Sequence, residues 1–96
     1  MAIVHVIHEN VRGCRTVAFD EHAIQRMTER SVSEDEVLDV LRSPDLTGLP
    51  TLPGQFRFRK NQSTRQWIDV IFEEDPTQIV VYSVWRKVRP NRGRAT

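Results

Sequence analysis

The sequence predicts an α+β fold in which two N-terminal helices pack on one face of an antiparallel β-sheet. Two stretches with helical periodicity come first and three extended stretches follow, at residues 21–30, 33–43, 56–60, 66–73 and 78–86. Helices that precede a run of strands are typical of the α+β class. Consecutive strands with short turns between them form an antiparallel meander. The order of the elements therefore predicts the fold class.

The N-terminal residues extend this picture. Residues 3–8 are β-branched and read as a short strand. Residues 10–13 form a turn, and residues 14–19 form a second strand. The sequence thus allows an extra N-terminal hairpin.

The first helix is expected from Glu21 to Arg30, with Asp20 at the N-cap. At about 100° per residue, His22, Arg26 and Arg30 lie within roughly 80° of one another. They form a polar stripe along one side of the helix. The apolar side chains lie further round and face a core: Ala23, Ile24 and Met27.

A capping box defines the start of the second helix. Ser33 can accept a hydrogen bond from the Glu36 amide, and the Glu36 carboxylate can accept one from the Ser33 amide. Val32 and Val37 are placed as a hydrophobic staple. Pro44 ends the helix, because proline disfavours helical geometry at the preceding residue. Two short helices therefore meet at a tight corner.

The strands alternate in character. Residues 56–60 place phenylalanines on one face and Arg57 and Arg59 on the other. Residues 66–73 place Trp67, Asp69 and Ile71 opposite an apolar face made of Ile68, Val70 and Phe72. Tyr82 and Trp85 are an odd number of residues apart, so they are expected on opposite faces, with at least one in the core.

Charge is distributed unevenly along the chain. Residues 1–45 hold five arginines and nine acidic residues, whereas residues 46–96 hold nine basic and four acidic ones. Such asymmetry indicates a half that faces a polyanion, although an ordinary solvated tail explains it equally well. We expect one domain over residues 1–88 and a basic flexible tail at 89–96.

Composition also bears on the compartment and on metals. The N-terminus has no basic region of a signal peptide and the chain has no long apolar run, so we expect a cytoplasmic protein with no membrane association. The lone Cys14 suits a reducing compartment. His5 and His8 point to opposite faces of a strand and make a poor chelate, so we predict no metal and no cofactor.

One segment carries a resemblance. The motif runs from Phe19 to Ser33, and its spaced residues are Phe19, His22, Ala23, Arg26, Met27, Arg30, Val32 and Ser33. An acidic second helix, a proline and a final strand ending in an aromatic residue follow it. Together they resemble the small bacterial proteins grouped as domain of unknown function 4258, over residues 17–88. The residue after Arg30 is often glycine in such sequences and is Ser31 in this one.

The resemblance implies a fold and an activity. Such families are thought to share the barnase/EndoU/colicin/RelE-like fold of toxin ribonucleases. It implies a toxin-like, metal-independent endoribonuclease, and a toxin–antitoxin pair with a cognate antitoxin protein as partner. RNA is the expected substrate.

Metal-free RNA cleavage needs proton transfer and cations on the phosphate. On this hypothesis the catalytic residues are His22, for proton transfer, Arg26 and Arg30, for the scissile phosphate, and Tyr82, in support. The expected RNA-binding residues are Arg57, Arg59, Lys60, Trp85, Arg86, Lys87 and Arg89.

Blander interpretations remain open. His22 can be a half-exposed residue near a helix cap, and Arg26 and Arg30 can form surface ion pairs worth about 0–1 kcal/mol. The alternative function is a non-catalytic RNA- or protein-binding module of the same fold. A third is a scaffold that pairs with a partner through an exposed edge strand.

Overall fold

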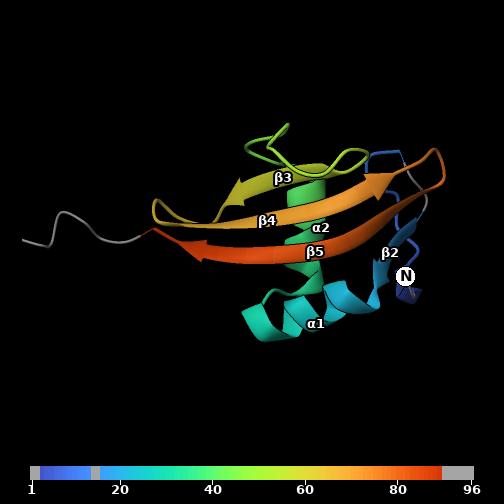
Figure 1. The fold of residues 1–96 in the computed structure, drawn as a ribbon, viewed down its shortest axis with the longest axis horizontal. Coiled ribbons are helices and arrows are strands. Elements are labelled where there is room, and N and C mark those ends of the chain that lie inside the picture. Colours follow the sequence, from blue (N-terminus) through green and yellow to red (C-terminus); the bar gives the residue numbers. More distant parts are fainter. Residues whose placement is uncertain (1–2, 14–15, 90–96) are drawn as a thin grey trace, which may run out of the picture.

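The computed structural model describes residues 3–13 and 16–89 (Figure 1). Seven elements follow one another: β1 (Ile3–Ile7), β2 (Thr16–Asp20), α1 (Glu21–Arg30), α2 (Glu34–Arg42), β3 (Phe56–Asn61), β4 (Gln66–Glu74) and β5 (Gln78–Val88). The predicted helices and strands are all present, with ends that differ by one or two residues. Cys14 and the tail beyond Arg89 lie outside the described residues.

The predicted antiparallel sheet is wrong. The five strands form one mixed sheet in the order β1-β2-β5-β4-β3. β3, β4 and β5 make the expected antiparallel meander and β1 and β2 the expected hairpin, but β2 pairs with β5 in parallel. The error has a physical origin. Strands β2 and β5 are separated by four other elements, and local sequence patterns do not specify the direction of so distant a pairing.

The helices also differ from the prediction of two helices on one face. α2 lies behind β3 and β4, and α1 lies beside β5 (Figure 1). β2 pairs with β5 only as far as Val81, so the remainder of β5 has no strand on that side. α1 continues from the end of β2 along this free edge. The Arg30 Nη1 group donates to the Val84 carbonyl of β5 at 3.0 Å.

Local capping fixes the corner between the helices. Asp20 accepts a hydrogen bond from the Ala23 amide at 2.8 Å, and the capping box of Ser33 and Glu36 is complete. Between the helices, Ser31 adopts a left-handed conformation with φ 55° and ψ 44°. Glycine, the residue that the resemblance led us to expect after Arg30, reaches this conformation at the least cost.

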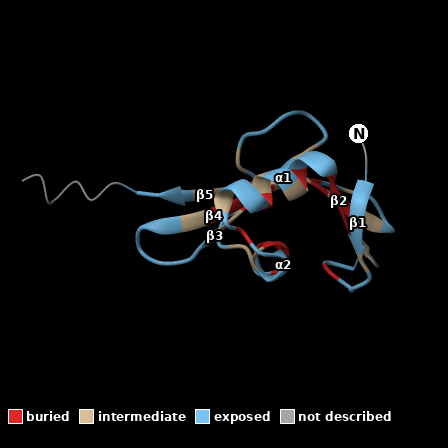
Figure 2. Ribbon diagram, turned by 90° about the horizontal axis from the view of Figure 1, so that it is seen from below, coloured by how far each residue is buried: buried red, intermediate tan, exposed pale blue. Residues whose placement is uncertain are grey.

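The core lies between the sheet and the helices. Phe58 and Phe72 meet edge to face, with ring centroids 4.9 Å apart, and Val84 and Leu41 are buried with them. In Figure 2 the buried segments, in red, lie on the inner sides of α1, α2 and β2. One continuous apolar cluster thus joins the hairpin, the helices and the meander.

A β-bulge changes the side on which the end of β5 presents its residues. Ile71 pairs with Ser83, but the next residue of β4, Phe72, pairs with Val81, so Tyr82 is the extra residue. As a result Val81 and Val84 are both buried although they are three residues apart. The expectation that Tyr82 and Trp85 lie on opposite faces is wrong, because the bulge breaks the alternation on which it rested.

Candidate functional site

The face of the sheet turned away from α2 is basic and aromatic. In the register, Arg59, Asp69 and Trp85 form one row across β3, β4 and β5, and Trp67 and Lys87 belong to the next row. Side chains directly opposite one another in paired strands share a face. We call this surface the basic–aromatic face; its residues are Arg57, Arg59, Trp67, Asp69, Trp85, Lys87 and Arg89.

Asp69 lies at the centre of this face and is fully buried. Its Oδ2 accepts from Arg57 Nε at 2.9 Å and Nη2 at 2.7 Å. Its Oδ1 accepts from Arg59 Nε at 2.7 Å, and Oδ2 also accepts from Arg59 Nη2 at 3.0 Å. The hydrogen bonds to Asp69 raise the pKa of Arg59 above its already high ordinary value. One carboxylate therefore holds both guanidinium groups.

Cations lie over both tryptophans of the face. The Arg59 guanidinium is 4.8 Å from the Trp67 ring centroid, and that of Arg89 is 5.7 Å from it. The Trp85 ring has Arg30 at 3.8 Å and Lys87 at 4.8 Å. The indole Nε1 of Trp67 is buried and has no hydrogen-bond partner among the described residues. Planar rings and cations therefore alternate over the surface.

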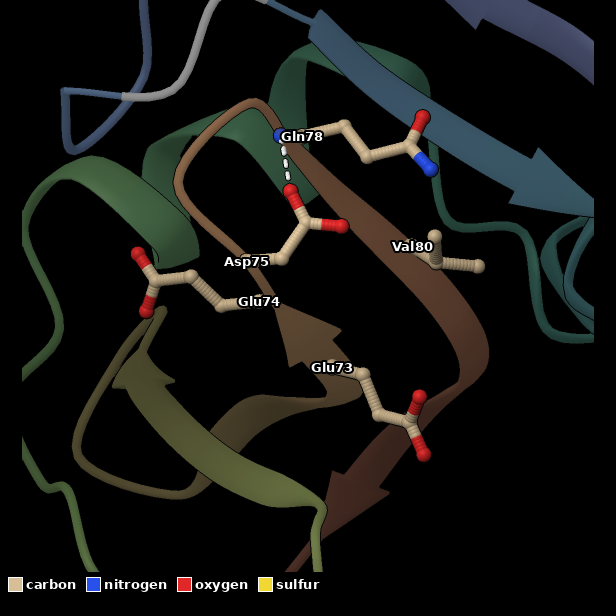
Figure 3. A pocket seen from close by; sticks show the side chains of 5 residues that line it. All are labelled: Glu73, Glu74, Asp75, Gln78 and Val80. Carbon is tan, nitrogen blue, oxygen red and sulfur yellow. Dashed lines mark hydrogen bonds between the residues drawn. The ribbon is translucent and has the colours of Figure 1, made fainter.

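The opposite end of the same sheet is acidic. A shallow pocket of about 80 Å³ lies at the β4–β5 turn (Figure 3). It is lined by Glu73, Glu74, Asp75, Gln78 and Val80. Hydrogen bonds from the Thr77 amide and hydroxyl and from the Gln78 amide lower the pKa of Asp75. This hollow would repel a phosphate, so it is no candidate for anion binding.

The hydroxyl group of Tyr82 is engaged at the acidic end of the sheet. It donates to the Glu73 carboxylate at 2.9 Å. Burial, this hydrogen bond and the charges of Glu73 and Asp20 raise the pKa of Tyr82. The phenol therefore keeps its proton at neutral pH.

The structure does bring His22 and Arg26 together. Arg26 Nε donates to His22 Nε2 at 3.2 Å, and Arg26 also pairs with Glu29. The hydrogen bond from Arg26 lowers the pKa of Glu29. The contact occupies the Nε2 atom of His22 and leaves the Nδ1 side of the ring free of this arginine. His22 is exposed and Arg26 half-buried.

Arg30 and Arg86 form the corner of the fold. Besides its contacts with Val84 and Trp85, Arg30 provides the main-chain oxygen to which Arg86 Nε donates at 3.3 Å. Arg86 Nη2 donates to the Ser31 carbonyl and to both carboxylate oxygens of Glu36, each at 2.8 Å. These contacts use the guanidinium of Arg86 for structure, which leaves it poorly placed for the predicted RNA contact.

Lys60 is similarly engaged. It lies on the covered face of β3, because its partner Ile68 is buried there, and its Nζ donates to the Ser43 carbonyl at the end of α2 at 2.9 Å. The predicted RNA-binding set therefore divides in two. Arg57, Arg59, Trp85, Lys87 and Arg89 share the basic–aromatic face, whereas Lys60 and Arg86 hold the helices to the sheet.

Sequence reasoning did not single out Asp69 or Trp67. The signal was present, because both alternate with the apolar residues of β4 and so had to share a face with Arg59. An acid between two arginines in the register suggests a buried ion pair only once the strand pairing is known. The pairing supplied that information.

Among residues 3–13 and 16–89, no group of three or more histidine, cysteine or acidic side chains could hold a metal ion. His5, one of the residues weighed for zinc, pairs instead with Glu34 of α2. No helix in the described part of the chain is long and apolar enough to cross a membrane.

The profile of the family described as Domain of unknown function (DUF4258) matches residues 19–86, which is more than half of the chain. The chain therefore belongs to this family. No curated protein and no solved structure matches it.

Proposed function

We propose that this member of the DUF4258 family binds single-stranded RNA on its basic–aromatic face. The observation that carries the proposal is the composition of that face. It combines four cations, Arg57, Arg59, Lys87 and Arg89, with two tryptophans and a single carboxylate that is fully buried. Proteins that bind single strands combine positive charge along the backbone with aromatic rings on which bases stack.

The shape of the face favours a single strand over a duplex. Trp67 and Trp85 belong to neighbouring rows of adjacent strands, so they are diagonal neighbours on this face and within reach of one another. Bases can stack on such rings, or on the guanidinium planes above them, only when they are unpaired. The acidic pocket at the far end of the sheet would keep phosphates at the basic end.

Fluorescence anisotropy with a labelled single-stranded oligouridylate tests this proposal. We expect binding that weakens with salt and that is lost stepwise when Lys87 and Arg89 are replaced by glutamine. Each lost phosphate contact should reduce the slope of log K against log salt by about 0.7. Gln66→Lys, at the exposed start of β4, is a control that changes the charge of the protein without removing Lys87 or Arg89. Binding that depends neither on salt nor on Lys87 and Arg89, or no binding at all, would overturn the proposal.

The contact between His22 and Arg26 favours a second candidate, metal-independent endoribonuclease activity. His22, Arg26 and Arg30 lie on one side of α1, and Arg30, at the C-terminal end of the helix, rests on Trp85 of the basic–aromatic face. A neutral imidazole can accept the proton of a 2′-hydroxyl, and an adjacent arginine can stabilise the phosphorane. On this proposal Arg26 moves its Nε–H from His22 Nε2 to a phosphate oxygen. The freed nitrogen takes the 2′-hydroxyl proton and returns it to the 5′-oxygen as the P–O bond to that oxygen breaks.

Cleavage and binding can be separated. His22→Gln should abolish cleavage of the oligonucleotide and leave its affinity unchanged, and His8→Gln on the exposed chain before β2 is the matched control. Unchanged cleavage would remove His22 from the mechanism. The toxin–antitoxin role stays a prediction; growth arrest on expression, relieved by the product of a neighbouring gene, would support it.

A further inference from the structure

We infer that Asp69 is a positioning residue that holds Arg57 and Arg59 as a two-guanidinium clamp for one phosphodiester group of the bound strand. The inference rests on the proposed RNA binding and adds a subsite and a residue to it. Neither the family description nor the charge pattern of the sequence assigns a role to Asp69.

The carboxylate of Asp69 lies deeper in the protein than the two guanidinium groups that it holds. The Asp69 side chain has no exposed surface, whereas Arg57 and Arg59 keep 28% and 24% of theirs. A ligand that approaches the face therefore meets two cations and not the carboxylate beneath them. The buried anion lowers the cost of holding two like charges side by side, and it does so without occupying the surface.

Asp69 occupies only some of the N–H groups of Arg57 and Arg59. Arg57 and Arg59 each give their Nε group and one Nη2 hydrogen to Asp69. An arginine has more N–H groups than these, and they remain for an acceptor outside. The hydrogen bonds that Arg57 and Arg59 donate within the described residues come from their Nε and Nη2 groups and not from Nη1. Phosphate oxygens are suitable acceptors, because guanidinium groups bind them through paired hydrogen bonds.

Two tryptophans lie next to Asp69 and its two arginines. Trp85 lies directly opposite Asp69 in the register, and Trp67 precedes Asp69 by two residues on the same face. Arg59 also rests on the Trp67 ring, which restricts its guanidinium further. The clamp is therefore flanked by two rings on which the bases on either side of the phosphate could stack.

Charge alone and positioning predict opposite results for Asp69→Asn. Removal of a negative charge makes the face more positive, so simple electrostatics predicts tighter binding. If Asp69 positions the clamp, the substitution loses the two-sided anchor and weakens binding of the labelled oligouridylate by about tenfold, which corresponds to one charge-assisted hydrogen bond. The sign of the change decides between them.

Glu73→Gln is the matched control. It removes the same charge from β4, keeps an acceptor for the Tyr82 hydroxyl and touches neither arginine of the clamp. We expect it to tighten binding by up to about twofold. If Asp69→Asn also tightens binding, or leaves it unchanged, the clamp is wrong. If the wild-type protein does not bind the oligonucleotide at all, the proposed function itself fails, which is a different outcome.

A second variant protects the test against misfolding. Arg59→Lys keeps the charge and the buried carboxylate but replaces the planar fork with a point charge. The clamp predicts about tenfold weaker binding for this variant, measured below its melting temperature, while Arg65→Lys in the β3–β4 turn leaves affinity unaltered. Equal affinities of Arg59→Lys and Arg65→Lys would overturn the clamp, whether or not Asp69→Asn folds.

Discussion

The two faces of the meander are built from the same three strands and differ in almost every property. The face toward α2 presents Phe58, Phe72 and Val84, which are all buried. The face away from it presents arginines and tryptophans around the single buried carboxylate of Asp69. Because side chains alternate along a strand, neighbouring residues belong to different environments. The comparison teaches that stability and the proposed binding are separable residue by residue.

The largest expected effect is on the covered face. Phe72 is fully buried and contacts Phe56 and Phe58, with ring centroids 5.5 Å and 4.9 Å away. Phe72→Ala should lower the free energy of unfolding by about 3–5 kcal/mol, because it removes buried surface and leaves a cavity. Urea denaturation followed by circular dichroism measures this. A loss below about 1 kcal/mol would mean that this face is not the core.

The next effect should appear on the open face and in binding. Trp85→Ala should weaken the affinity for single-stranded RNA by about 1–3 kcal/mol, the usual value for one stacked base. Its stability cost should be smaller than that of Phe72→Ala, since Trp85 is only half-buried and contacts Arg30 and Lys87. Anisotropy and urea denaturation on the same preparation compare the two. An unchanged affinity would argue against the face as a stacking surface.

The corner at Glu36 belongs to the covered side and should respond to pH. Burial acts to raise the pKa of Glu36, but hydrogen bonds from Ser33 and Arg86 outweigh it, and the pKa lies below its ordinary value of 4.5. A lowered folded-state pKa gives stability that is present above the unfolded pKa and is lost as pH falls through the folded one.

The wild-type protein should therefore exceed Glu36→Gln in stability by about 1 kcal/mol or less at neutral pH. The difference should start to decrease as pH falls below 4.5 and should be lost as pH passes through the lower folded-state pKa. Thermal melting at a series of pH values measures it. A constant difference at all pH values would show that the Arg86 contact contributes nothing through charge.

The smallest expected effect concerns the turn between the helices. Ser31 has positive φ, so Ser31→Gly should relieve a left-handed conformation and stabilise the protein by about 0.5–1 kcal/mol. The Ser31 carbonyl, which accepts from Arg86, is retained. A higher melting temperature with unchanged RNA affinity would show that the corner at Ser31 does not influence binding on the basic–aromatic face. A change in affinity would show that it does.

Local patterns determined much of this protein. The cap at Asp20, the capping box at Ser33 and the two faces of β4 could each be read from a few neighbouring residues, and all are present. The same patterns located the stripe of His22 and Arg26, which are in contact. These features depend on interactions within one helix turn or one strand, so the sequence alone specifies them.

Tertiary structure decided the rest. The parallel pairing of β2 with β5, the bulge at Tyr82 and the burial of Asp69 under two arginines all depend on segments that are distant in the chain. It also assigned Arg86 and Lys60 to structural contacts, although their charges alone resembled those of Arg57 and Arg59. The sequence shows only that a side chain is charged. The strand register determines whether that side chain donates to an acceptor within the fold or lies on the exposed face of the sheet.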